Sequence, residues 1–518
     1  MLKGKILLCI AMLCLCQSAG AAKNGTLLFV PLDNRPVCLD YTVETMRSAG
    51  WDVKVPPREY IAGSVEAGKP DQLMDWLEQE GKTATASVIS SDALLYGGLV
   101  GSRTHALSPD VLKGRVERLL SLKDNTHKQN IYVFTTIMRS PKASAAPVEP
   151  AYYAQWGPKL FRLGALQDKG DVQRLHHGER KELQRLQQEI PQDVLQDMYT
   201  RRENNIKATE LLLHGLEEGN FDYLLLGRDD TATFSQAHRE ARALDILVHE
   251  LPQGRIRFFA GADQLGLVLL QRAACRLRYE LPLVNVTYAA GEGGATIPTY
   301  EDNTVAESAK QHIYAAGAFP TTRRKHADLV LAVNTPKNGI CLEASDAKNN
   351  GKLDQQTRSF ADKVTRLVGH GYKVALADVK YGNGADNALV PQLFSQNIAY
   401  KLAAYGGWNT SGNTLGFALA QGLLAPKMPA EAQQQLLEQR YLDDWAYQAN
   451  ARMRVYQKLI WPNYWPNSGL NVEQQKAAEA AIAREIRDVA APCLGKNVDK
   501  YTFTLPWQRM FEVKVDKR

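Results

Sequence analysis

The chain has 518 residues, a formal net charge of +6 and a charged fraction of 23%. Its mean hydropathy of -0.32 is typical of a globular protein. A chain of this length can form one large α/β domain with additional helices, or two to three smaller domains. The positive charge is too small to indicate nucleic-acid binding, and the sequence has no basic stripe with interleaved aromatic residues.

The N-terminal segment has the features of a secretory signal peptide. Lys3 and Lys5 form a basic start, residues 6–16 form an apolar run too short to cross a bilayer, and residues 19–21 are a small-residue cleavage site. We therefore predict that residues 1–22 are a signal peptide and that the protein is periplasmic or secreted. The alternative is a retained membrane anchor. No later apolar stretch is long enough to span a membrane.

Removal of the signal peptide would leave four cysteines, Cys38, Cys275, Cys341 and Cys493. In an oxidising compartment they allow three pairings, so we expect at most one or two structural disulfides. No Cys-x-x-Cys string or Cys/His cluster has the spacing of a zinc site, and no cofactor is predicted.

From about residue 26, strand-like and helix-like segments alternate. The predicted strands cover residues 26–32, 53–55, 87–90, 131–136, 223–227, 256–260, 283–288, 329–333, 374–377 and 402–405. Amphipathic stretches lie between them, which is typical of βαβ units and a parallel sheet. We expect an α/β fold with a TIM-barrel-like parallel sheet, although ten strands slightly exceed the eight of such a barrel.

Two regions depart from this alternation. Residues 142–218 begin with a Pro-rich, aromatic entry and continue with helical patterns, which predicts a helical insertion over the strand ends. Residues 425–518 are almost entirely helical in pattern and end in an extended tail. We therefore expect a barrel-like catalytic domain over residues 23–424, with residues 425–518 packed on it as a helical region.

Aspartates recur where the predicted strands end. They are Asp33, Asp92, Asp229, Asp230, Asp263 and Asp378. Functional groups of α/β folds gather at the carboxyl ends of strands, so these side chains predict one acidic cluster assembled from several strands. The alternative is that each aspartate caps the helix that follows it.

Asp229 and Asp230 are the strongest candidates for catalysis. They follow the apolar run Tyr223-Leu-Leu-Leu-Gly-Arg. Two neighbouring carboxylates cannot both ionise freely, so the pKa of one is raised, and that group can donate a proton while the other stabilises charge. Glycosidases require this division of roles. The same pair could instead bind a metal ion in phosphate or hydrolytic chemistry.

Two later loops suit the recognition of sugar hydroxyls. The first contains Asp378 and Asn383 among glycines, with a calcium loop or a plain turn as alternatives. The second contains Trp408, Asn409 and Asn413. Trp408 offers a flat face for stacking on a pyranose, and the asparagines offer hydrogen-bond donors and acceptors. A turn with a helix cap is the alternative for the second loop.

Several strings resemble a bacterial family known as domain-of-unknown-function family 4127. The resemblance covers about residues 25–515 and rests on Pro31-Leu-Asp-Asn-Arg-Pro36, Ser91-Asp-Ala-Leu-Leu-Tyr-Gly-Gly98, Gly227-Arg-Asp-Asp230, Gly261-Ala-Asp263 and the stretch from Gly407 to Gly416. It implies no chemistry by itself.

The order of the acidic and Asn-rich loops is also similar to that of the substrate-assisted β-N-acetylglucosaminidases of the O-GlcNAcase type, which are TIM barrels. This resemblance implies that Asp229 holds the acetamide group of the substrate and that Asp230 is the general acid/base. It further implies that Asp378 and Asn409 bind sugar hydroxyls.

We therefore predict a glycoside hydrolase that acts on a carbohydrate, with Asp229 and Asp230 as the catalytic pair. The resemblance to the O-GlcNAcase type implies that this carbohydrate contains N-acetylhexosamine. The residues expected to bind the substrate are Asp33, Arg35, Asp92, Asp263, Asp378, Asn383, Trp408, Asn409 and Asn413. One alternative is a metal-dependent hydrolase that uses the strand-end aspartates as ligands. The other is a non-catalytic periplasmic glycan-binding protein. The sugar, the stereochemical outcome and the oligomeric state stay open.

Overall fold

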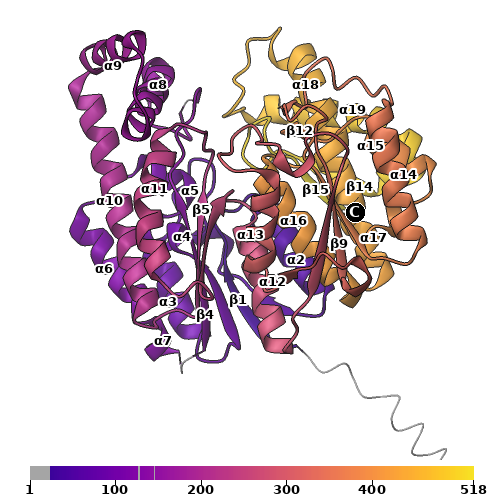
Figure 1. Cartoon of the computed structure of the whole chain (residues 1–518), viewed down its shortest axis with the longest axis horizontal. Coiled ribbons are helices and arrows are strands. Elements are labelled where there is room, and N and C mark those ends of the chain that lie inside the picture. Colours follow the sequence, from indigo (N-terminus) through magenta and orange to yellow (C-terminus); the bar gives the residue numbers. More distant parts are fainter. Residues whose placement is uncertain (1–23, 127–128, 145) are drawn as a thin grey trace, which may run out of the picture.

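The computed structural model describes residues 24–126, 129–144 and 146–518 (Figure 1). The predicted signal peptide, residues 1–22, lies outside the described residues. The chain is a mixed α/β protein whose long strands form parallel sheets, as the sequence predicted. Among the described residues, no helix combines the length and the apolar character needed to cross a bilayer.

The first sheet has six parallel strands in the order β2-β1-β3-β4-β5-β6. Their bounds are β1 (Thr26–Val30), β2 (Asp52–Lys54), β3 (Ala86–Ser90), β4 (Asn130–Ile137), β5 (Tyr223–Arg228) and β6 (Ile256–Ala260). This is a doubly wound order, in which the chain first turns outward from β1 to β2 and then continues from β3 on the other side of β1.

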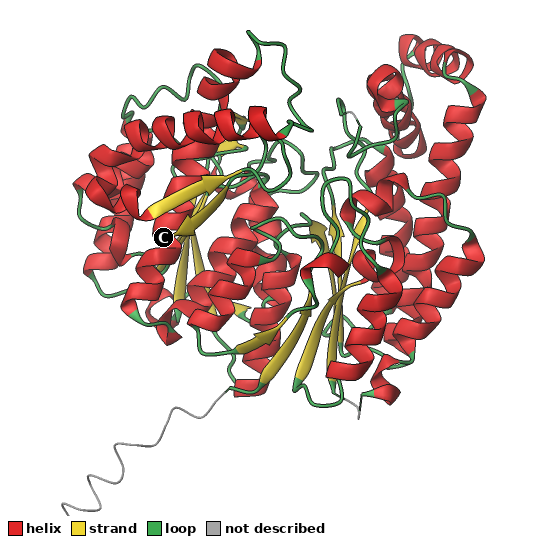
Figure 2. Ribbon diagram, turned by 180° about the vertical axis from the view of Figure 1, so that it is seen from behind, coloured by secondary structure: helices red, strands yellow, loops and turns green. Residues whose placement is uncertain are grey.

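The second sheet has five parallel strands and repeats the same order, with β8 and β9 on either side of β7 and then β11 and β13. Their bounds are β7 (Leu283–Tyr288), β8 (Phe319–Pro320), β9 (Leu329–Asn334), β11 (Val374–Asp378) and β13 (Ala404–Gly406). A closed barrel requires the outermost strands to pair. Within the described residues the edge strands of the two sheets do not pair, so the ten predicted strands are present but divide between two open sheets (Figure 2).

Side chains of each strand alternate between two cores. Leu27 and Phe29 of β1 face the middle of the molecule, while Leu28 and Val30 face the outer helices. Both faces of the sheet are therefore covered, which explains why the strands are apolar throughout rather than alternating with polar residues.

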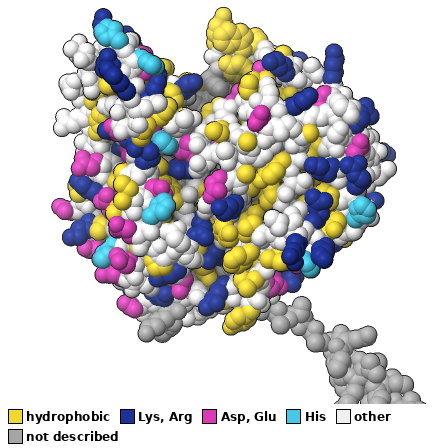
Figure 3. All heavy atoms as spheres, in the orientation of Figure 1, with side chains coloured by type: hydrophobic (Ala, Val, Ile, Leu, Met, Phe, Trp, Pro, Cys, Tyr) yellow, Lys and Arg dark blue, Asp and Glu magenta, His cyan; other side chains and the backbone are white. Residues whose placement is uncertain are grey.

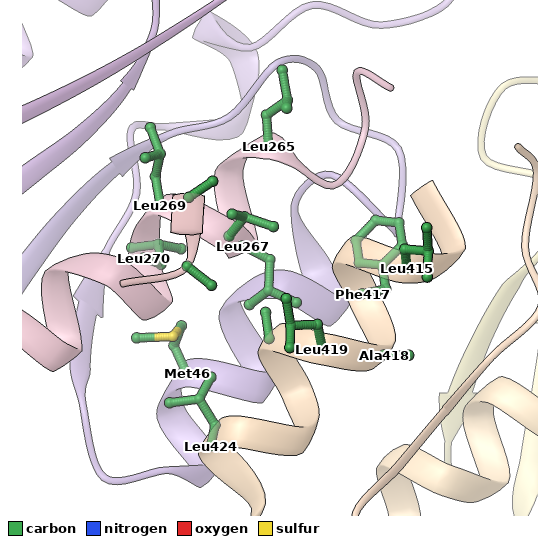
Figure 4. Packing of buried hydrophobic residues seen from close by; sticks show 14 of the residues in the cluster. Met46, Leu265, Leu267, Leu269, Leu270, Leu415, Phe417, Ala418, Leu419 and Leu424 are labelled. Carbon is green, nitrogen blue, oxygen red and sulfur yellow. The ribbon is translucent and has the colours of Figure 1, made fainter. Parts of the chain in front are cut away.

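A layer of four helices lies between the two sheets (Figure 1). It consists of α2 (Asp40–Ser48), α12 (Leu265–Arg278), α13 (Val305–Ala315) and α16 (Ser411–Leu424). Met46 of α2, Leu267 of α12 and Leu419 of α16 meet there in one hydrophobic core, to which both sheets contribute (Figure 4). Each sheet with the helices on its outer face forms one lobe, and the shared core holds the two lobes together.

Helix α16 is buried on almost every side, because it contacts both its neighbouring helices and the second sheet. Two of its glycines permit this close packing. A Cβ atom on Gly416 would come within 2.2 Å of Gln264, and one on Gly412 would come within 2.5 Å of the Ala260 carbonyl oxygen at the end of β6. The start of α16 is thus packed directly against the first sheet.

The outer face of the first sheet is covered by helices that the sequence placed between its strands. They are α3 (Pro70–Glu80), α4 (Ser91–Tyr96), α6 (Pro109–Leu120), α7 (Leu122–Asn125), α10 (Gln192–Glu217) and α11 (Gln236–Glu250). The predicted insertion is helical, with α8 (Tyr153–Val172) and α9 (His177–Glu189) packed on the start of α10 in a small core of their own.

The outer face of the second sheet is covered by α14 (Gln355–Gly369), α15 (Leu389–Ser395), α17 (Ala430–Arg440) and α19 (Val472–Leu494). Helix α17 continues through the π-helical segment η7 (Tyr441–Ala451), α18 (Arg452–Val455) and η8 (Tyr456–Ile460). The tail forms an antiparallel pair, β14 (Tyr501–Thr504) and β15 (Lys514–Lys517). The four described cysteines are free thiols.

Candidate active site

A cavity of about 770 Å³ lies where the carboxyl ends of both sheets meet. Its volume is in the range of sites for small organic ligands. The lining residues that follow strands of the first sheet are Arg35, Arg139, Asp229, Asp230 and Asp263, and those on the side of the second sheet include Tyr300, Asn383, Asn409 and Asn413. Figure 3 shows the surface hollowed between the α8–α9 insertion and the opposite lobe.

Asp229 and Asp230 follow β5 and both line the cavity, each paired with a different arginine. The Asp229 carboxylate lies 2.5 Å from Nη2 of Arg103, a residue of α5 (Leu99–Thr104). The Asp230 carboxylate lies 3.0 Å from Nη1 of Arg139, which follows β4. The exposed fractions of the two aspartate side chains are 10% and 26%, so Asp230 is the more accessible to a ligand.

The pKa of Asp230 is raised to about 6. Burial is the largest cause, and the negative charge of Asp229 adds to it, while Arg139 and Arg103 oppose the shift. This agrees with the physical expectation for two adjacent carboxylates. Asp230 can therefore hold a proton in mildly acidic solution and is suited to donate it to a bound ligand.

Glu149 joins the two arginines into one network. It is buried and lies 2.6 Å from Nε of Arg139 and 3.5 Å from Nη1 of Arg103. Sequence patterns do not single out Glu149, Arg139 and Arg103, because these residues come from a loop, a strand end and helix α5 and share no motif. They fix the positions of both catalytic candidates.

Asp263 forms a second charged group at the end of β6. Its carboxylate accepts a hydrogen bond from Arg35, which is also paired with the buried Asp33. Burial raises the pKa of Asp263, Arg35 opposes this, and the charges of Asp33 and Asp229 add to it. Arg35 and Asp263 line the cavity, whereas Asp33 lies behind them as the partner of Arg35.

The second sheet contributes amides rather than charges. Asn409 donates to the Asp263 carboxylate at 3.2 Å, and Oδ1 of Asn413 accepts from the Asp263 backbone N–H at 3.1 Å. Asn383 directly follows the short strand β12 (Tyr381–Gly382). Its backbone N–H donates to the Asn409 carbonyl, and its side-chain N–H donates to the Glu343 carboxylate. Glu343 belongs to β10 (Leu342–Glu343), the partner of β12.

Backbone strain is concentrated around this cavity. Eight non-glycine residues of the described chain have a positive φ, and four of them line the cavity: Asp230, Tyr300, Asn383 and Asn409. Asparagine and aspartate tolerate this conformation, but for a bulky tyrosine it is uncommon. Such residues cluster at functional sites, where the surrounding structure holds them in place.

Three of the predicted substrate-binding aspartates are buried outside the cavity lining: Asp33, described above as the partner of Arg35, and also Asp92 and Asp378. Asp92 is enclosed and accepts hydrogen bonds from the backbone N–H and the hydroxyl of Thr136, at 2.9 and 3.1 Å. Asp378 is 1% exposed and accepts hydrogen bonds from Asn334, Tyr405 and the backbone of Asp386. Since none of these three side chains lines the cavity, none is placed to contact a substrate there.

Trp408 also differs from its prediction. It is 2% exposed and packs in the core against Phe417 and Phe511, so its ring face is not available for stacking on a sugar. The tryptophan that does line the cavity is Trp507 of the C-terminal tail. Its ring lies near the guanidinium groups of Arg35 and Arg509.

The C-terminal region is thus part of the site and not only a support for the sheets. Asn467, Ser468, Trp507, Arg509 and Phe511 all line the cavity. The indole N–H of Trp507 donates to Asn34 at 2.6 Å, which ties the tail to the loop after β1. No local sequence pattern predicts this contact, because Trp507 and Asn34 are 473 residues apart in the chain.

The carboxylates of the cavity are matched to arginines rather than to one another. Among the described residues, His, Cys, Asp and Glu side chains form no group of three or more placed to hold a metal ion. The cavity instead combines the Asp230 carboxyl group, carboxylate–arginine ion pairs and the side-chain amides of three asparagines. These groups can transfer a proton to a polar, hydroxyl-rich ligand and orient it.

The comparisons with known proteins give a family. Residues 27–516 match the model of the family described as "Protein of unknown function (DUF4127)", and the chain belongs to this family. No curated protein matches the chain.

Proposed function

We propose that this member of the family is a glycoside hydrolase acting on a glycan that contains N-acetylhexosamine, with Asp230 as the general acid/base. The observation that supports this most is the position of Asp230. It is the more accessible carboxylate of an adjacent pair in the cavity, its backbone is held at a φ of +32°, and its pKa is raised to about 6. The predicted signal peptide would place the reaction in the periplasm or outside the cell.

In the proposed reaction Asp230 gives its proton to the oxygen of the leaving group. The acetamide carbonyl oxygen of the substrate attacks the anomeric carbon as the glycosidic bond breaks, and an oxazoline forms. Asp229, whose carboxylate is paired with Arg103, accepts a hydrogen bond from the acetamide N–H and stabilises the positive charge that develops there. Water then opens the oxazoline and returns a proton to Asp230.

In this proposal the side-chain amides of Asn383, Asn409 and Asn413 supply the contacts to the sugar. Asn409 and Asn383 line the cavity and use their side-chain N–H groups on Asp263 and Glu343, so their carbonyl oxygens are left as acceptors for the ligand. Asn413 uses its carbonyl oxygen on the Asp263 backbone, so its N–H group is left as a donor. Sugar hydroxyls can form hydrogen bonds with these amide atoms as donors or acceptors.

A non-catalytic glycan-binding protein is the second candidate, favoured by the position of the cavity between two lobes, a common place for ligand sites. A metal-dependent hydrolase is the third, but it lacks a ligand cluster among the described residues. Ordinary two-carboxylate catalysis with Asp263 as nucleophile is a variant of the first candidate.

A turnover screen on aryl glycosides, including aryl N-acetylglucosaminides, tests the proposal. We expect turnover that survives excess EDTA and is inhibited by a thiazoline analogue of N-acetylglucosamine, which mimics the oxazoline. Loss of activity in EDTA would favour the metal hydrolase. Binding of N-acetylglucosamine oligomers without any turnover would favour the binding protein. A covalent sugar trapped on Asp263 by a fluorinated substrate would replace substrate assistance with two-carboxylate catalysis.

A further inference from the structure

Besides Trp507, the segment that follows η8 brings aromatic residues close to the edge of the cavity. We define the rim loop as residues 461–468, with the sequence Trp-Pro-Asn-Tyr-Trp-Pro-Asn-Ser. Its last two residues, Asn467 and Ser468, line the cavity. Trp461 and Tyr464 are 65% and 92% exposed. Figure 3 shows a hydrophobic projection beside the hollow, in the region of α18 and the loop after η8.

The rim loop is held in place rather than hanging free. Backbone hydrogen bonds join Tyr464 to Trp461 at 3.1 Å and Trp465 to Ile460 at 3.0 Å. Tyr464 has a φ of +53°, a conformation that a tyrosine adopts only where its surroundings impose it. The Asn467 carbonyl accepts the backbone N–H of Met510, which fixes the loop to the tail that lines the cavity.

The chemistry of the rim loop is neutral. Residues 461–472 contain no Asp, Glu, Lys or Arg, and two prolines restrict the backbone between the aromatic residues. Aromatic rings offer flat apolar faces, and the neighbouring asparagines offer hydrogen-bond donors and acceptors. This combination suits a ligand whose surface alternates apolar C–H faces with hydroxyl and amide groups.

We infer that the rim loop binds the sugar units of a glycan chain that continues out of the cavity, so that the substrate is an oligomer or polymer rather than a small glycoside. Trp461 and Tyr464 stack on successive units outside the cavity, while Asn467 and Ser468 contact the unit that enters it. The inference rests on the proposed function for the identity of the ligand, since it names a chain of N-acetylhexosamine units.

A lipid surface is the competing occupant for exposed aromatic residues. Segments that lie on membranes combine apolar side chains with Lys or Arg residues that meet anionic headgroups. The rim loop has no cationic residue, and its position is continuous with the cavity wall. Both observations favour the glycan.

Equilibrium binding of chitobiose and chitohexaose to the full chain tests the inference. Wild-type protein should bind chitohexaose at least about ten-fold more tightly than chitobiose. Each of Trp461→Ala and Tyr464→Ala should weaken chitohexaose binding by roughly three- to ten-fold, the range of one aromatic contact, and leave chitobiose binding unchanged. Circular dichroism should show intact folds, because both side chains are exposed.

Tyr279 provides a matched control. It is 89% exposed with a φ of +55°, but it ends α12 and does not line the cavity. Tyr279→Ala should change neither affinity. Equal affinity of wild-type protein for the two oligomers, no binding of chitohexaose, or an equal effect of the Tyr279 variant would overturn the inference.

Two further outcomes separate this inference from the proposed function. Tight, rim-dependent binding of chitohexaose without hydrolysis leaves the rim site standing and removes the hydrolase. Turnover of aryl glycosides with no preference for the longer oligomer keeps the hydrolase and removes the rim site. Co-sedimentation with phosphatidylcholine vesicles that is lost in Trp461→Ala would assign the loop to a membrane and overturn the glycan inference.

Discussion

The two sheets share a strand order, yet the carboxylate pairs at their strand ends differ in one decisive respect. Asp229 and Asp230 follow β5 and face the cavity. Asp378 ends β11 and lies beside Asp386, but both are buried behind the cavity wall. The pKa of Asp378 is raised to about 7, even further than that of Asp230, by burial and by the charge of Asp386.

The difference teaches that a raised pKa does not identify a catalytic acid. The Asp378 carboxylate is enclosed by internal hydrogen-bond donors, and Asp386 is paired with Lys380 at 2.9 Å. The contacts of Asp386 with Asp378 and Lys380 hold the loop that carries Asn383 at the cavity. The first sheet therefore places accessible carboxylates in the cavity, while the second-sheet side contributes uncharged side chains such as Asn383, Asn409 and Tyr300.

The largest expected effect is on stability, at the end of β13 in the second sheet. Trp408→Ala should lower the free energy of unfolding by about 3–5 kcal/mol, because it removes a large side chain from the core. Urea unfolding measures this. Trp461→Ala, on the exposed rim loop, is the control and should change the unfolding free energy by less than about 0.5 kcal/mol. Similar effects of both variants would mean that Trp408 is not a core residue.

The next effect is on catalysis, at the first sheet. Asp230→Asn should lower turnover of an aryl glycoside by at least about 100-fold, since the amide cannot act as a general acid or base. The unfolding free energy should change little, because the side chain is partly exposed. Steady-state kinetics with a thermal melt of the same sample measures both. Wild-type activity in this variant would remove Asp230 from the mechanism.

Asp378→Asn is the counterpart on the second sheet. It should lower the unfolding free energy by about 1–3 kcal/mol through disturbed buried hydrogen bonds, while the folded fraction keeps turnover within about three-fold. Activity per folded molecule gives the readout. A loss of turnover as large as that of Asp230→Asn, without unfolding, would place Asp378 in the chemistry and end the distinction between the two pairs.

Asp378 also makes the stability of the wild-type protein depend on pH, and the Asp378→Asn variant lacks this contribution. The pKa of Asp378 is about 7 in the folded state and lies near 4 in an unfolded chain. The folded protein therefore keeps a proton that the unfolded chain releases, and the contribution to stability falls as the pH rises from about 4 to about 7. The stability difference between wild type and Asp378→Asn should shrink between pH 5 and pH 8 in urea unfolding.

The local parts of this fold follow from sequence patterns. Apolar runs bounded by polar residues predict the ten principal strands, and the strand-end rule correctly brings Asp229, Asp230 and Asp263 to one cavity. The division into two sheets does not follow from such patterns. Which strands become neighbours depends on helices such as α16, whose burial between the sheets is decided by contacts far apart in the chain.

The same limit explains the errors within the site. Trp408 is flanked by glycine and asparagine, as in an exposed loop, and its burial arises from Phe417 and Phe511. Arg103 and Glu149 carry no motif, because an ion pair needs only proximity in space. Strand-end position thus predicts where side chains gather, while exposure to the cavity depends on the tertiary packing around them.

The smallest expected effect concerns the electrostatics of Asp230. Arg139 lies beside its carboxylate and lowers its pKa, so removal of the positive charge in Arg139→Gln should raise that pKa. A general acid must be protonated, and activity therefore falls as the pH rises through its pKa. The alkaline limb of the pH–kcat/KM profile should move upward by about one pH unit in Arg139→Gln. Arg139→Lys retains the charge and should leave the limb near its wild-type position. If the alkaline limb does not move in Arg139→Gln, a group other than Asp230 controls it. The difference between Asp230 and the buried Asp378 would then rest on their accessibility to the cavity alone.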